Sequence, residues 1–178
     1  MSQFSLSRVW TLALCLLLSG LLLDVGTGAA QEIGLVPWLG GPTPPLILKD
    51  LNGQSYDLMQ ARGKAVVIHF WATWCPPCQE ELPAIQQFRD LFRDRPVEIV
   101  TVNVAEGEKR VQRFAAEVSL KLPVLLDRNA EAQHAWKVRG LPATFVLDAQ
   151  GAIRYWYLGE LDWSQPGLVR TIESILPR

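Results

Sequence analysis

The junction between an apolar run and the segment after it constrains this chain more than any other feature. Residues 64–73 (KAVVIHFWAT) are mostly apolar and rich in β-branched side chains, which is typical of a strand buried on both faces of a sheet. Over residues 76–92 apolar side chains recur at helical spacing, so this segment is predicted to be a helix that bends at Pro83. Cys75 and Cys78 therefore lie where a buried strand meets the start of a helix.

Strand-like and helix-like patterns alternate along the rest of the chain. An order of strand, helix, strand, helix, strand and then an antiparallel hairpin predicts an α/β domain with a mixed central sheet flanked by helices. The other expected elements are a hairpin turning at Asn52-Gly53, a strand over 97–104, a helix over 107–118, a strand over 122–127, a short helix over 130–136, a hairpin turning at Gly151 and a closing helix over 167–176.

The first 30 residues differ from the rest of the chain. An apolar run over 9–23 ends in small residues, which is the layout of a secretory signal peptide cleaved after Ala30. The alternative is an uncleaved anchor, although a span needs about 20 apolar residues. Either one predicts a periplasmic or other extracytoplasmic protein, free or attached to the inner membrane through 9–23. Residues 31–45 are expected to be an extended lead-in, and 46–178 the folded domain.

Composition excludes one class of partner. The chain has 17 basic and 18 acidic residues, and it lacks the clustered excess of Lys and Arg that nucleic-acid-binding proteins show. We therefore expect no nucleic-acid partner. Separately, we expect the domain to act as a monomer.

Cys75 and Cys78 admit three interpretations. A purely structural disulfide across so short a loop would contribute only about 2 kcal/mol. A zinc site needs two more ligands, and only His69 and His134 remain as histidines, so we expect no metal and no cofactor. A redox couple explains the position as well, because the start of a helix favours a thiolate. Cys75 is then the nucleophile, and Cys78 the thiol that resolves the mixed disulfide.

Two stretches resemble a known family. FWATWCPPC with ELP behind it, and GLPATFVLDAQG further along, resemble the TlpA-like, ResA-type thiol-disulfide oxidoreductases of the thioredoxin superfamily. The similarity extends from about Leu46 to Trp163. It implies a thioredoxin-like fold with an N-terminal hairpin and a helix-strand insert at about 106–127.

The resemblance also implies how a substrate is held. Pro142 would be a cis-proline facing the cysteines, whereas sequence alone favours an ordinary trans-proline. Leu141 would offer backbone hydrogen bonds to an extended substrate segment. Trp74, next to the nucleophile in the chain, is expected to touch substrate.

Two residues are candidates for proton transfer. Glu81 stands where the family keeps a glutamate that influences cysteine proton transfer, and it lies on the same side of the predicted helix as Cys78. His69 occupies the position at which thioredoxin has a buried acid. A neutral imidazole there could take the proton of Cys78, but a hydrogen-bonded core histidine fits the sequence equally well.

The residues between the cysteines bear on the direction of electron flow. Pro76 and Pro77 carry no N–H, so of the nearby donors only the N–H of Cys78 could reach the Cys75 sulfur. A weakly stabilised thiolate makes a reducing couple. We therefore predict a protein-disulfide reductase that acts on a partner cysteine pair in cytochrome c or copper-site maturation, with a membrane thiol protein as electron donor. The alternatives are a disulfide-forming oxidant and a copper-binding maturation module.

Overall fold

The structure is a computed structural model, and it describes residues 34–177. They build one eight-stranded mixed sheet, with the strand order β1-β8-β7-β4-β5-β6-β2-β3. The strands are β1 Val36–Pro37, β2 Ile47–Asp50, β3 Ser55–Asp57, β4 Ala65–Trp71, β5 Val97–Val104, β6 Val124–Asp127, β7 Ala143–Leu147 and β8 Ile153–Leu158.

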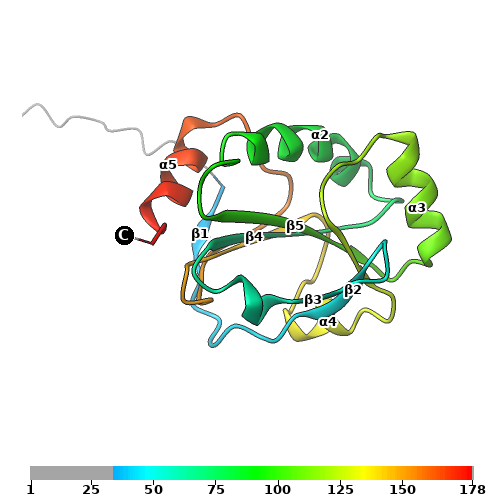
Figure 1. Ribbon diagram of the computed structural model, residues 1–178, viewed down its shortest axis with the longest axis horizontal. Helices are drawn as coiled ribbons and strands as arrows, with labels where there is room; N and C mark the ends of the chain where they lie inside the picture. Colours follow the sequence, from blue (N-terminus) through cyan, green and yellow to red (C-terminus); the bar gives the residue numbers. More distant parts are fainter. Residues whose placement is uncertain (1–33, 178) are drawn as a thin grey trace, which may run out of the picture. The chain divides into compact units, whose positions relative to one another are not determined.

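Helices cover both faces of the sheet. Figure 1 shows α2, α3 and α5 on one side of the strands, and the short helices on the other. A hydrophobic cluster fills each side: one beneath α2 and α5, the other beneath η1 and α4. The helices are η1 Leu58–Ala61, α2 Pro76–Asp90, α3 Glu108–Glu117, α4 Glu131–Ala135 and α5 Pro166–Ser174.

Strand β4 lies in the middle of the sheet. Strand β5 pairs with it in parallel on one side and β7 in antiparallel on the other. All seven of its residues are buried, because the two hydrophobic clusters pack against its two faces. The prediction of a strand buried on both faces is confirmed. Since β7 runs in the opposite direction, its first residue, Ala143, pairs with Phe70 near the end of β4. The end of β4 and the segment before β7 therefore meet at the same end of the strands, which is the edge of the sheet at the carboxyl end of β4.

Most expected elements are present, and their observed ends lie within two residues of the predicted ones. Both hairpins turn where the sequence predicts, at Gly53 and Gly151, whose φ angles of 78° and 80° suit glycine. The helix-strand insert is α3 followed by β6. Helix α2 ends at Asp90, two residues earlier than predicted, and Pro83 lies inside it.

The predicted lead-in over 31–45 contributes to the sheet. Val36 and Pro37 pair with Trp156 and Tyr155 of β8, as an edge strand, where proline is tolerated. The Trp38 ring then packs 5.7 Å from that of Phe145. Pro and Gly content correctly excluded a central strand but did not reveal this edge strand. The predicted signal or anchor segment lies outside the described residues, and none of the helices within 34–177 is long and apolar enough to cross a membrane.

Candidate active site

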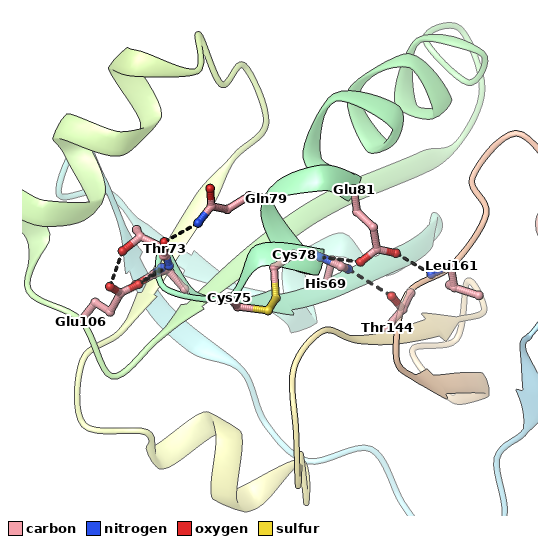
Figure 2. Close-up of a disulfide and its surroundings, with 10 residues drawn as sticks. His69, Thr73, Cys75, Cys78, Gln79, Glu81, Glu106, Thr144 and Leu161 are labelled. Atoms are coloured by element: carbon pink, nitrogen blue, oxygen red, sulfur yellow. Dashed lines mark hydrogen bonds and ion pairs between the residues drawn. A yellow bond between two sulfur atoms is a disulfide. The ribbon is translucent and has the colours of Figure 1, made fainter.

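Cys75 and Cys78 form a disulfide at the start of α2, with Cα atoms 5.3 Å apart (Figure 2). Cys75 is the N-cap residue and Cys78 belongs to the first turn. Cys75 keeps 4% of its surface exposed and Cys78 none. An incoming thiol or disulfide can therefore reach the Cys75 sulfur more readily.

Few backbone donors are free at this helix start. The first N–H groups of a helix normally lack an intrahelical partner. Here the Cys75 N–H donates to the Ala72 carbonyl at 3.2 Å, and Pro76 and Pro77 have no N–H. In the described chain, the Cys78 N–H is thus the only one of these first donors left to face the Cys75 sulfur.

His69 and Glu81 lie together behind the disulfide, from β4 and α2 respectively (Figure 2). Both are buried. The His69 Nδ1 atom is 3.1 Å from the Thr144 hydroxyl, and Glu81 Oε1 accepts from the Leu161 N–H at 2.6 Å and from the Trp163 indole at 2.9 Å. The remaining atoms, His69 Nε2 and Glu81 Oε2, are 3.7 Å apart, and neither has a hydrogen-bond partner among the described residues.

Burial acts on both groups by disfavouring their charged forms. It lowers the pKa of His69 to about 3, so the imidazole is neutral at pH 7. It raises the pKa of Glu81 to about 7, against the opposing effect of the hydrogen bonds from Leu161 and Trp163. Near neutral pH the pair can therefore hold or release one proton at Glu81 Oε2, facing His69 Nε2.

The segment before β7 carries the other predicted site residues. The Leu141-Pro142 peptide bond is cis, as the family resemblance implies. Pro142 directly precedes β7 and so lies at the sheet edge where β4 leads into the cysteines. Leu141 packs against the hydrophobic cluster that contains both cysteines. Trp74 is 60% exposed beside Cys75, whereas His134 is exposed on α4.

Sequence reasoning missed a second buried carboxylate. Glu106 follows β5, and its carboxylate accepts hydrogen bonds from the backbone N–H and the hydroxyl of Thr73, both at 2.6 Å. The available signal was an acidic residue just after a parallel strand next to β4, because the carboxyl ends of parallel strands meet at one sheet edge. Within residues 34–177 no three His, Cys, Asp or Glu side chains gather closely enough to hold a metal ion.

Comparison with known proteins agrees with this geometry. The redoxin family model matches residues 39–173. The chain belongs to the redoxin family. The thiol-disulfide oxidoreductase ResA of Geobacillus kaustophilus (strain HTA426) is 34% identical over 139 residues, which are 78% of this chain and 79% of the relative.

Solved structures show the same fold. StoA from Bacillus subtilis has a TM-score of 0.63 and 26% identity, covering 75% of this chain and 99% of StoA. A Chlorobium tepidum protein described as a thiol:disulfide interchange protein DsbE has a TM-score of 0.71 and 25% identity, covering 78% and 97% of the two chains. This redoxin is therefore a ResA-type thiol-disulfide oxidoreductase with a thioredoxin-like fold.

Proposed function

We propose that this redoxin is an exported protein-disulfide reductase that reduces a cysteine pair in a partner protein. One observation carries the direction. The two residues after Cys75 are prolines without an N–H, so among the first donors of α2 only the Cys78 N–H is available to the Cys75 sulfur. A thiolate with few donors is weakly stabilised, and a couple whose reduced form is weakly stabilised gives up its electrons readily.

The exchange proceeds in two steps that conserve electrons. The Cys75 thiolate attacks a sulfur of the partner disulfide, forming a mixed disulfide and releasing the partner's other sulfur as a thiolate, which takes a proton from solvent. The Cys78 thiolate then attacks the Cys75 sulfur. The partner leaves with both cysteines reduced, and the Cys75–Cys78 disulfide seen in the structure is restored. Two electrons must return from a thiol donor, for which we propose a membrane protein.

Cys78 needs a base for the second step, since its side chain is fully buried. We assign that role to the His69–Glu81 pair, which lies behind the disulfide and leaves one nitrogen and one oxygen without another partner among residues 34–177. In its deprotonated form the pair accepts the Cys78 proton. On the solvent side, Trp74 and the backbone of Leu141 are proposed to hold an extended partner segment beside Cys75.

The apolar run over 9–23 and its small-residue ending support the proposed export. In an oxidising compartment, a reductase of this kind serves proteins whose cysteines must be kept reduced. Thiol sites that receive haem or copper have this need, so we propose cytochrome c or copper-site maturation as the setting.

The reduction potential of the Cys75–Cys78 couple tests the direction. We expect a value near that of thioredoxin, which is about −270 mV, when the protein is equilibrated with a dithiol buffer of known potential. A value close to the about −120 mV of DsbA would instead make the protein a disulfide-forming oxidant.

A further inference from the structure

Glu106 occupies an unusual place for a carboxylate. The residue is buried, and Figure 2 shows it with Thr73 on one side of the disulfide, while His69 and Glu81 lie on the other. Ala105 just before it adopts a left-handed φ of 57°, a conformation that costs a non-glycine residue energy. The chain thus accepts backbone strain at the residue that leads into Glu106.

The contacts of Glu106 converge on the residue two positions before Cys75. Besides the N–H and hydroxyl of Thr73, its carboxylate accepts from the Asn103 amide at 2.8 Å and pairs with the Arg110 Nε at 3.0 Å. Arg110 Nε also donates to the Thr73 hydroxyl at 2.8 Å, and the Gln79 amide donates to the Thr73 carbonyl at 2.7 Å. Every polar group of Thr73 is therefore held.

The two charges in this cluster differ in their access to water. The Glu106 side chain is 4% exposed, whereas that of Arg110 is 61% exposed. Arg110 is bonded to Thr73, so its positive charge lies beside the segment that leads from β4 into Cys75. The negative charge of Glu106 offsets it. Loss of the carboxylate charge would leave the Arg110 cation without its counter-charge beside Thr73, two residues before Cys75, and an uncompensated cation there would favour a Cys75 thiolate.

We propose that Glu106 and Arg110 are positioning residues of the redox site. They hold the segment between β4 and Cys75 in place through Thr73, and their opposite charges balance each other's electrostatic effect on the reduced Cys75 sulfur. The proposal rests on Cys75 being the nucleophile, as proposed above, and it is independent of the direction of electron flow and of the partner. Substitutions at 106 and 110 leave the other charged and titratable groups of this region unchanged. These are His69 and Glu81 behind the disulfide, and Arg113 and Glu117, which line a surface pocket together with Thr73 and Arg110.

The test compares Glu106→Gln, Arg110→Gln and the double variant, all purified in the reduced form. The pKa of Cys75 is read from the pH dependence of its alkylation rate, and the reduction potential from a dithiol buffer. Glu108→Gln is the matched control, because Glu108 lies on α3, as Arg110 does, but pairs with Arg128.

We expect Glu106→Gln to lower the pKa of Cys75 by about 0.5 unit and Arg110→Gln to raise it by about 0.5 unit, with the potential moving up and down accordingly. The double variant should return toward the wild-type values, and Glu108→Gln should match them. Because Arg110 is exposed, its variant remains informative even if Glu106→Gln fails to fold.

Shifts in the same direction for both single variants, or no shift in Arg110→Gln, would overturn the charge balance. These shifts are measured relative to wild type, so an oxidising wild-type potential would reject the reductase proposal and leave this one intact.

Discussion

Glu81 and His69 lie together in the protein interior, where burial favours the neutral form of each side chain. It raises the pKa of Glu81 and lowers that of His69. Glu81 is fixed by two donors to a single oxygen, and His69 by Thr144 through a single nitrogen. The atoms left over face each other at 3.7 Å. At the residue scale the site is thus a proton-holding pair rather than a permanent ion pair.

The raised pKa of Glu81 predicts a pH dependence of stability. A carboxyl whose pKa rises from 4.5 unfolded to about 7 folded contributes stability below pH 4.5, and this is lost as pH rises through 7. We expect the unfolding free energy of the oxidised wild type, minus that of Glu81→Gln, to fall by up to about 3 kcal/mol between pH 4.5 and 8.

Taking this difference removes the contribution of His69, which has the opposite sign: its lowered pKa stabilises the fold above about pH 6.5, and that stability is lost as pH falls toward 3. Urea unfolding at several pH values provides the measurement. Glu80→Gln, at the exposed neighbouring position, should give a nearly constant difference. A constant difference for Glu81→Gln as well would mean that its carboxyl is not the titrating group.

At the scale of the element, we expect the first turn of α2 to determine how strongly the Cys75 thiolate is stabilised. Pro76 and Pro77 stand at the first helical positions, where proline fits the helix geometry but supplies no N–H. Helix dipole and cysteine position therefore favour the thiolate, while the missing donors limit how far they do so.

Replacing Pro77 with His should raise the potential. The variant gains a backbone N–H and an imidazole near the Cys75 sulfur, so the reduced form becomes more stable. We expect the Cys75 pKa to fall by about 1 unit and the potential to rise by about 30 mV, since that rise corresponds to about 1.4 kcal/mol in a two-electron couple. Equilibration with glutathione measures the potential.

Pro83→Ala is the control for this helix. It removes a proline from the interior of α2, away from the first turn, and should leave the potential unchanged. Equal potentials for wild type and Pro77→His would argue that the prolines do not determine the redox direction.

At the scale of the whole molecule, the strand order gathers the site. The end of β4, the segment before β7 and the loop after β5 meet at one edge of the sheet, which brings Cys75, Pro142 and Glu106 to the same region. A partner segment approaching this region would meet Cys75, the proposed nucleophile, together with Pro142.

Removing the resolving thiol should trap that partner. In Cys78→Ser the mixed disulfide cannot be released, so we expect a covalent complex in the exported fraction, identified by non-reducing electrophoresis and mass spectrometry. Cys75→Ser, which lacks the nucleophile, should form none. Absence of any complex with Cys78→Ser, in cells where the wild type is active, would contradict the two-step exchange.

Local patterns in the sequence were sufficient for the cysteine pair at the start of a helix, for both hairpins and for the buried strand. Periodicity and turn residues act over a few positions, so they need no knowledge of the fold. The family motifs added the cis-proline. Tertiary structure alone decided that Glu106 reaches Thr73 across 33 positions, that Glu81 meets Leu161 across 80, and that Val36 and Pro37 join the sheet. Such contacts depend on strand order and register, which bring distant segments together and leave no periodic trace in the chain.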